Sequence, residues 1–469
     1  MRSALKLTPS VAVLVLGCTP EAAEGPCPQV EDACLRAERR DGTCIAVPDV
    51  GAPCGEDGTG TCNPAGACAG PQMALSANLE HTCVVLHDKS TWCWGDNTWA
   101  QLGNGGYDFA PSPARAELPP AIAIGTGYAH SCAILESGAV ACWGDNEAGQ
   151  SAWPATQTPI PLPAVVIGLE DLRFVAVTAG KGHTCALSDA GDVHCWGYND
   201  YGQCGVDPQS GPGGPTIRAV APSQTPVLSG VRELIANKNH ACALTESQEV
   251  QCWGDNSAGQ LGADPATIPY SFEPLPVALA GGVHALHVGL GFESSYAVGE
   301  NQRLYAWGRN SRGQLGNGST EPDFAPTPSE TLFEQDGELV PLESVTDVFR
   351  ADGSHQCARL AESAPLASSY VCWGGNDYGE LGYGTLPVMG EVFPAAHPAT
   401  ALPQNGGRLA FGEDYGCVVV PHDVAVANDY DDVWCWGQRE LVGDGSVADP
   451  EQAQLEPARV RWIAAAPDG

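Results

Sequence analysis

Basic residues are scarce in this sequence of 469 residues: 21 Lys and Arg stand against 56 Asp and Glu, for a formal net charge of −35. Such a polyanion repels phosphates, so the composition argues against a DNA or RNA partner. No apolar run reaches the length of about 18 residues that a transmembrane helix needs. Gly-rich phosphate loops, HExxH motifs and GxSxG nucleophile elbows are also missing, so we assign no catalytic, cofactor-binding or metal-binding residue.

Cysteine, in contrast, is abundant, and the beginning of the chain explains why. The 20 Cys residues indicate an oxidising compartment. Arg2 and Lys6 precede the apolar stretch 11–16, and Gly17-Cys18 follows it, which is the pattern of an export signal. We therefore expect an exported protein.

The Gly17-Cys18 pair also resembles the lipobox of bacterial lipoproteins, in which the Cys is lipidated and becomes the first residue of the mature chain. The resemblance implies that residues 1–18 are a signal peptide with a lipobox and that Cys18 is the lipid attachment site. Thr19, in place of Asp, favours the outer membrane or cell surface. Ordinary cleavage near Ala22-Ala23 is the alternative, and it also leads to export.

Residues 19–26 form a short linker, and residues 27–70 form a cysteine-rich spacer with almost no large apolar side chain. Such a segment cannot build a core and depends on disulfides. Its six cysteines allow about 15 connectivities, among which the sequence does not choose, and no CxxC or Cys-His spacing supports a zinc site. They are Cys27, Cys34, Cys44, Cys54, Cys62 and Cys68.

From residue 71 to residue 469 the chain is repetitive. Each unit holds short alternating apolar runs bounded by Gly, Asp and Ser, which indicate antiparallel strands joined by hairpins. A Pro-containing piece before each unit suits an edge strand. About four strands in each of seven units predict an all-β, seven-bladed β-propeller. The seven units are marked by Trp-Gly pairs beginning at Trp94, Trp143, Trp196, Trp253, Trp307, Trp373 and Trp436.

The combination of His before an apolar strand, then Trp-Gly, Asn and Gly-Gln-Leu-Gly, as in WGDNSAGQLG, resembles the regulator of chromosome condensation repeat. The resemblance covers nearly all of the chain after the spacer and implies the same seven-bladed fold. The family includes a guanine nucleotide exchange factor, a secreted β-lactamase inhibitor and many binding modules. It therefore implies a fold without choosing a function.

The cysteines of the repeats test this interpretation. In four units two Cys stand ten residues apart with a turn midway, so they face each other across neighbouring strands, within reach of a disulfide. In units six and seven the pairs are wider apart, and unit five has Tyr296 and Ala306 at the two positions. The predicted disulfides are Cys83–Cys93, Cys132–Cys142, Cys185–Cys195, Cys242–Cys252, Cys357–Cys372 and Cys417–Cys435.

Two further expectations concern the remaining cysteine and the closure of the ring. Cys204 is left over and is interpreted as a small buried apolar side chain. The C-terminal piece LEPARVRWIAAAPDG repeats the Pro-strand pattern, while unit one has no Pro strand before it. We therefore expect the C-terminus to supply a strand that closes blade one. Whether 73–77 or 462–466 forms the next strand is left open.

Two clusters could suggest metal sites. A His precedes the first Cys of five blades by two residues, but repetition of a structural position explains the series better than a metal ring does. An acidic insertion in blade seven could take Ca²⁺, although its spacing fits no EF-hand loop and a solvated hairpin tip is favoured. The residues concerned are His81, His130, His183, His240 and His355, and Asp423, Asp429, Asp431 and Asp432.

Aromatic residues in the connections are the best candidates for a binding surface, with Trp153, Tyr270 and Phe324 as possible anchors. Tyr107, Phe109, Phe272 and Phe333 belong to the same set. Packing of these side chains onto the ring is the equal alternative. The expected function is non-catalytic binding of a protein or glycan at the cell surface by a monomer that touches the membrane only through its lipid. Inhibition of a secreted enzyme and polysaccharide processing are alternatives, and nucleotide exchange is the least favoured.

The lipid anchor can be tested directly. Replacement of Cys18 by Ala removes the acylated side chain, so the Cys18→Ala variant should leave the membrane pellet and lose palmitate labelling in fractionated cells. A variant that still pellets and still takes up palmitate would show that Cys18 is not the lipid site.

Overall fold

The computed structural model divides the chain into two compact units, residues 1–72 and 73–469. The division falls next to the expected boundary at residue 71. The residues described are 35–40, 43–48, 53–54, 60–62, 68–69, 73–152, 154–209, 219–361, 364, 368–385, 390–403, 407–420, 432–444 and 453–460. Within these ranges no helix is long and apolar enough to cross a membrane.

The first unit contains two small antiparallel sheets. Strands β1 (Leu35–Arg40) and β2 (Thr43–Pro48) form a hairpin, and β3 (Pro53–Cys54), β4 (Gly60–Cys62) and β5 (Cys68–Ala69) form a three-stranded sheet. In the latter, Cys62 and Cys68 are opposite each other in the register. The spacer disulfides themselves lie outside the described residues.

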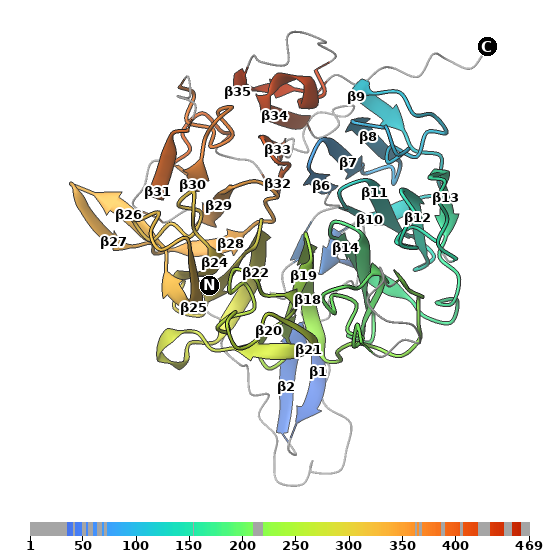
Figure 1. Ribbon diagram of the computed structural model, residues 1–469, viewed down its shortest axis with the longest axis horizontal. Helices are drawn as coiled ribbons and strands as arrows, with labels where there is room; N and C mark the ends of the chain where they lie inside the picture. The colour runs from blue at the N-terminus through green and yellow to red at the C-terminus, as the bar shows by residue number, and fades with distance from the viewer. Residues whose placement is uncertain are drawn as a thin grey trace, which may run out of the picture. The chain divides into compact units, whose positions relative to one another are not determined.

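The second unit is a ring of seven blades, each an antiparallel sheet with four consecutive strands (Figure 1). Blade one has β6 (Ala74–Asn78), β7 (His81–Val85), β8 (Thr91–Gly95) and β9 (Ala110–Arg115). Blade two has β10 (Ala121–Thr126), β11 (His130–Leu135), β12 (Val140–Gly144) and β13 (Ile160–Val165). Blade three has β14 (Phe174–Ala179), β15 (His183–Ser188), β16 (Val193–Tyr198) and β17 (Ala219–Val220).

The remaining blades repeat this order. Blade four has β18 (Val231–Asn237), β19 (His240–Thr245), β20 (Val250–Asp255) and β21 (Tyr270–Val277). Blade five has β22 (Ala285–Gly291), β23 (Ser294–Gly299), β24 (Leu304–Arg309) and β25 (Phe324–Glu330). Blade six has β28 (Val345–Val348), β29 (His355–Leu360), β30 (Tyr370–Gly375) and β31 (Val392–Pro398). Blade seven has β32 (Leu409–Phe411), β33 (Tyr415–Val420), β34 (Asp432–Gln438) and β35 (Ala453–Arg459). Two short 3-10 helices, η2 (Ala280–Gly282) and η3 (Arg439–Leu441), lie in the connections.

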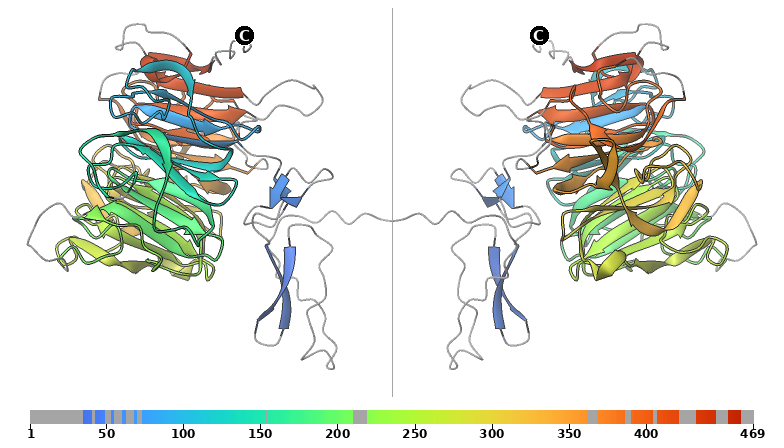
Figure 2. Two further views of the ribbon diagram at one scale, coloured as in Figure 1. Left: turned by 90° about the vertical axis from the view of Figure 1, so that its right-hand side faces the viewer. Right: turned by 90° about the vertical axis from the view of Figure 1, so that its left-hand side faces the viewer.

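The first strand of each blade lies nearest the centre and the fourth lies at the rim (Figure 1). The two side views show the ring from its edge, as a single layer of blades (Figure 2). Blade six is wider than the others, because a hairpin of β26 (Leu332–Gln335) and β27 (Glu338–Pro341) joins its outer strand through a parallel bridge between Phe333 and Ala396. The seven-bladed, all-β prediction is therefore confirmed.

The Pro-containing strands are edge strands, but each is the last strand of its blade and not a leading piece. Pro111 and Pro113 in β9, for example, lie in the outermost strand of blade one, where a missing amide breaks no further ladder. Blade one therefore has its own Pro strand.

The expected closure of blade one by the C-terminus is consequently wrong. Strand β35 pairs with β34 inside blade seven, with Trp434 opposite Arg459, and the first strand of blade one is β6. Each blade is made of contiguous chain and none of the described strands crosses from one blade to another, so blades seven and one are joined by side-chain contacts. Residues 462–466, the other candidate, lie outside the described residues.

Six disulfides join the second and third strands of six blades, and they are the pairs that the spacing predicts. In each, the two cysteines are directly opposite in the register, as Cys132 and Cys142 are, with Cα atoms 4.0 Å apart. Tyr296 and Ala306 face each other at the same place in blade five. Each bridge closes only one hairpin, so by chain entropy it stabilises the fold by about 2–3 kcal/mol.

Packing between the blades forms the core. The seven Trp residues of the Trp-Gly pairs are fully buried, each in a cluster with side chains of the adjacent blade. Trp94 belongs to the cluster that joins blade one to blade seven, together with Met73, Tyr415 and Val442. This cluster takes the place of strand exchange in closing the ring.

The disulfide pattern predicts the outcome of peptide mapping without reduction. Each of the six bridges should be recovered within a single blade, and Cys204 should be the one unpaired cysteine of residues 73–469. Because Cys204 is 1% exposed, a thiol reagent should label it only after unfolding. Bridges between blades, or rapid labelling of the native protein, would contradict this arrangement.

Candidate functional site

One end of the ring carries two sets of turns that are bonded to each other. The turn between the first and second strands accepts a backbone hydrogen bond from the turn after each Trp-Gly pair; for example, Asp96 N donates to Glu80 O over 2.8 Å and Asp145 N donates to Ala129 O over 2.8 Å. The same bond recurs in the other blades. We call this end of the ring the loop face.

The turns that follow Trp-Gly are rigid because their polar side chains bond within the turn. In blade one, Asn97 Oδ1 accepts from Leu102 N over 3.0 Å, and Gln101 bridges Trp99 N and the Asp96 carboxylate. Gly95 before the turn has φ of +99°, and a Cβ there would lie 2.2 Å from the carbonyl oxygen of Glu80. These bonds explain the recurrent Gly, Asn and Gln.

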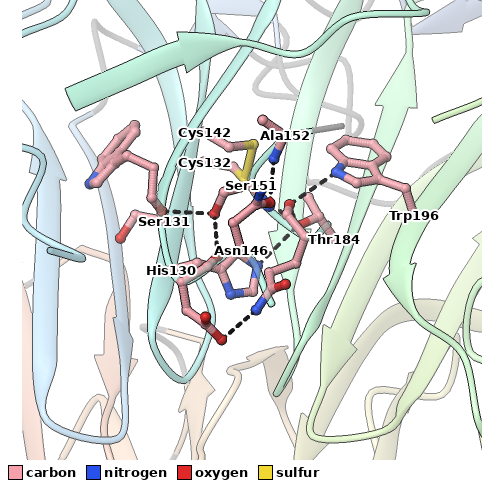
Figure 3. The surroundings of a disulfide bond; sticks show 12 residues. His130, Ser131, Cys132, Cys142, Asn146, Ser151, Ala152, Thr184 and Trp196 are labelled. Atoms are coloured by element: carbon pink, nitrogen blue, oxygen red, sulfur yellow. Dashed lines mark hydrogen bonds between the residues drawn. A yellow bond between two sulfur atoms is a disulfide. The ribbon is translucent and has the colours of Figure 1, made fainter. Parts of the chain in front are cut away.

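The same turns connect neighbouring blades. The indole N–H of Trp143 donates to the Gln101 carbonyl over 2.7 Å. That of Trp196, which is labelled in Figure 3, donates to the Gln150 carbonyl over 3.0 Å. All seven indoles make this bond to the preceding blade. At the closure, Trp94 donates to Leu441 O over 3.1 Å, although blade seven has no Gln there.

The buried histidines belong to this structural network. His81 Nε2 lies 3.0 Å from Ser131 Oγ in the next blade, and Ser131 donates its hydroxyl hydrogen to the Gln101 carbonyl, so Nε2 is the donor to the hydroxyl. His130 makes the same contact with Thr184 over 2.9 Å (Figure 3). Tyr415 replaces the His in blade seven, and its hydroxyl lies 2.8 Å from Thr82 Oγ1.

Burial keeps these imidazoles neutral, because it lowers the pKa of His81 to about 4 and that of His130 to about 3. No group of three or more His, Cys, Asp or Glu side chains within the described ranges could hold a metal ion. Three of the five histidines, His81, His130 and His240, contact a hydroxyl of the next blade through Nε2.

Two histidines of the repeated position, His183 and His355, lack a hydrogen-bond partner for Nε2, and the sequence explains both cases. The residue after the His position supplies the hydroxyl, but blade four has Ala241 there and blade seven has Gly416. His183 of blade three lies next to blade four, and His355 of blade six lies next to blade seven. Both therefore have no hydrogen-bond partner on either ring nitrogen. His355 packs against Phe411 instead, with ring centroids 5.2 Å apart.

The candidate anchor residues fall into three groups. Phe324 is 41% exposed and lies opposite Arg309 in the register, and half-buried Tyr270 lies opposite Asp255, so both begin a fourth strand beside the loop face. Phe333 is 9% exposed and packs in the core between blades five and six, so it is not an anchor. Trp153 lies outside the described residues.

Sequence reasoning missed two exposed aromatic residues of this surface. Trp99 and Tyr201 are 43% and 36% exposed, and each stands five residues after the Trp of a Trp-Gly pair. Aligned repeats could have identified them, since the same position holds an aromatic residue in blade six as well, Tyr378, and Ala, Arg or Leu in the other blades. Together with Tyr107, Phe109 and Phe324 they form a set of exposed aromatic residues in or next to the segments between third and fourth strands.

The acidic side chains of the loop face differ in whether a cationic side chain pairs with them. In blade five, Glu293 pairs with Lys238 and Arg309, and although burial acts to raise its pKa, these two cations hold the pKa below its ordinary value. In blade seven, burial and then the charges of Glu380 and Glu413 raise the pKa of Asp414 to about 7. Negative charge therefore accumulates around blades seven and one.

Polar side chains join the blades across the centre of the ring. Arg350 Nη1 and Asn78 Nδ2 both donate to the carbonyl of Thr126, over 2.8 Å and 3.1 Å. Asp352 Oδ2 accepts from Leu79 N over 3.2 Å. Burial lowers the pKa of Arg350 to about 10 and raises that of Asp352 to about 6. Blade six is thus tied to blades one and two without a strand between them.

Other candidate residues are placed as follows. Cys204 is buried, its thiol donates to Tyr198 O over 3.3 Å, and burial raises its pKa well above the ordinary value, which agrees with a structural role. Cys18, Asp423, Asp429 and Asp431 lie outside the described residues, and of Asp432 only the backbone, at the start of β34, is described.

Fold and site together define a β-propeller whose blades are locked by disulfides and by indole–carbonyl bonds. Residues 113–468 match the family model of the RCC1-like domain. The chain belongs to the RCC1-like family.

Relatives agree over parts of their length. The ultraviolet-B receptor UVR8 of Arabidopsis thaliana is 29% identical over 64% of this chain and 61% of its own length. The probable E3 ubiquitin-protein ligase HERC4 of Homo sapiens is 28% identical over 55% of this chain and 23% of its own length. The chain thus spans less than two thirds of these proteins.

Solved structures agree in fold. Human WBSCR16 has a TM-score of 0.64 at 20% identity, covering 80% of this chain and 94% of its own. Prp20p from Saccharomyces cerevisiae has a TM-score of 0.63 at 21% identity, covering 84% and 89%. At these identities the likeness establishes the fold alone.

The missing hydroxyl in blade four generates a prediction. In an Ala241→Ser variant the new hydroxyl can accept from His183, so the free energy of unfolding should rise by about 0.5–1.5 kcal/mol in urea titrations. The matched variant Ser131→Ala, which leaves His81 without its partner, should lower it by about 1–3 kcal/mol. No gain for Ala241→Ser beside a clear loss for Ser131→Ala would mean that the two sites are not equivalent.

Proposed function

We propose that this protein is a non-catalytic binding module at the cell surface, which holds a protein or glycan partner on its loop face. Export and lipidation at Cys18 would place it on the outer membrane. The observation that carries the proposal is the set of exposed aromatic side chains on a rigid scaffold, with exposures from 36% for Tyr201 to 51% for Tyr107. Aromatic side chains that are exposed on rigid elements are typical binding hot spots.

The construction of the blades supports this division of roles. The residues that recur in the repeats make contacts within and between blades, so they are not available for binding. They are Trp, Gly, Asn, Gln and the cysteines. Segments between the third and fourth strands differ from blade to blade, so they are free to carry specificity. Family members also support binding: Prp20p is described together with its binding to Gsp1p and histones, and UVR8 is named a receptor.

The test is alanine substitution at the exposed aromatics. Trp99→Ala and Phe324→Ala should each weaken the complex with a partner captured from envelope or culture proteins by about 2 kcal/mol or more. Because both side chains are partly solvated, the melting temperature should hardly change. Titration calorimetry with the identified partner gives the affinity.

A control comes from another exposed apolar side chain. Ile167 is 65% exposed and follows β13, which ends opposite Ala141 at the start of β12 and therefore at the end of the ring away from the loop face. Ile167→Ala should bind normally. Equal loss in all three variants, or unchanged binding in Trp99→Ala and Phe324→Ala, would place the binding surface elsewhere.

A further inference from the structure

Three acidic side chains cluster on the loop face where blades seven and one meet. Glu80 and Glu413 are exposed, Asp414 is half-buried, and the backbone brings them together, since Glu413 N donates to Leu79 O over 3.1 Å. None of the three takes part in an ion pair among the described side chains. The corresponding acid of blade five, Glu293, has two cationic partners. The charge of this cluster is therefore uncompensated.

A fourth carboxylate reaches the cluster from the centre of the ring. Asp352 is 1% exposed, and its Oδ2 accepts from the amide of Leu79, the residue before Glu80. Its Oδ1 has no hydrogen-bond partner. A buried carboxylate oxygen without a donor is costly, and a cation that supplies a donor relieves the cost.

Among the described side chains, no cation forms an ion pair with this cluster, although the charge of Arg350 acts to lower the pKa of Asp352. Arg350 is the nearest by sequence, but it makes no ion pair within 4.0 Å of Asp352, and its Nη1 donates to the Thr126 carbonyl. Lys238 is bound to Glu293. The carboxylates still repel one another: burial and then the negative charges of Asp96 and Glu413 raise the pKa of Glu80.

The separation between the carboxylates determines which kind of cation can bind to them. No group of three or more acidic side chains within the described ranges is close enough to hold a metal ion. An ammonium or guanidinium group, in contrast, carries several donors and can bond to carboxylates that lie further apart. The exposed position of Glu80 and Glu413 makes the cluster accessible to a side chain that another molecule presents.

We propose that Glu80, Glu413 and Asp414, with Asp352 beneath them, form an acidic mouth that receives lysine or arginine side chains of a basic protein segment. The proposal rests on the proposed function, because it names the chemistry of the partner that the loop face holds. It selects a protein partner over a glycan, since neutral sugars offer no cation to this cluster.

The experiment compares two variants of equal net charge in the full-length protein. Glu80→Gln/Glu413→Gln/Asp414→Asn neutralises the acidic mouth. Glu117→Gln/Glu249→Gln/Glu338→Gln removes three exposed acids from other connections and hairpins. The probe is a deca-lysine peptide, with a deca-glutamate peptide as the negative control, and titration calorimetry at physiological salt measures the affinity.

The acidic-mouth variant should bind deca-lysine about tenfold more weakly than the wild type, since three exposed ion pairs of modest strength are lost. The control variant should lose less than about twofold. Both should keep the wild-type melting temperature, because the one hydrogen bond given for the replaced side chains, from Ser247 Oγ to Glu249 Oε2 over 3.3 Å, is exposed and can be kept by the Gln amide oxygen. Equal losses in the two variants would show that binding follows net charge alone and would overturn the proposal.

The outcome is separable from that of the proposed function. If the acidic-mouth variant binds deca-lysine normally while Trp99→Ala and Phe324→Ala lose their captured partner, the loop face binds but its partner is not held by this cluster. If the acidic mouth binds the peptide as expected and the aromatic variants bind normally, the acidic mouth stands and the aromatic surface fails.

Discussion

The bond from a buried indole N–H to a carbonyl of the preceding blade is the interaction on which the ring depends. A buried indole N–H needs a hydrogen-bond acceptor, and each Trp of a Trp-Gly pair finds one in the turn after Trp-Gly of the preceding blade. In blade one the Asn97 and Gln101 side chains fix the backbone of this turn. The motif residues are therefore parts of one device for joining blades.

The same device explains why ring closure needs no strand exchange. Blade seven has lost the Gln, yet Leu441 presents its backbone carbonyl to Trp94, because the acceptor is a main-chain atom and does not require a particular side chain. The bond between the Thr82 and Tyr415 hydroxyls takes the place of the His contact that His81 and His130 make. Polar contacts of Arg350 and Asp352 across the centre add further links between blades that are not neighbours.

A scaffold that is locked from within can vary at its surface. The disulfides lie in the hairpins of the second and third strands, and the indoles bond to the turns directly after Trp-Gly, so neither constrains the remainder of the segments that lead to the fourth strands. These segments carry the exposed aromatics, and the turns between the first and second strands of blades one and seven carry Glu80, Glu413 and Asp414 of the acidic mouth. Rigid support and variable loops are the usual arrangement of a binding protein.

The amino-acid sequence by itself determined the number of blades, the six disulfides within them and the edge position of the Pro strands. These features are local: two cysteines ten residues apart face each other across one hairpin, independently of how the blades pack in the ring. Only the tertiary structure decided to which blade each Pro strand belongs, because the sequence of a repeat does not mark where the blade begins. The closure of blade one was misassigned for that reason. It also decided that Phe333 is buried while Phe324 is exposed, and that Glu80 and Glu413, far apart in the chain, stand together. Ring closure brings the two ends of the propeller into contact, and no local pattern records which side chains then meet.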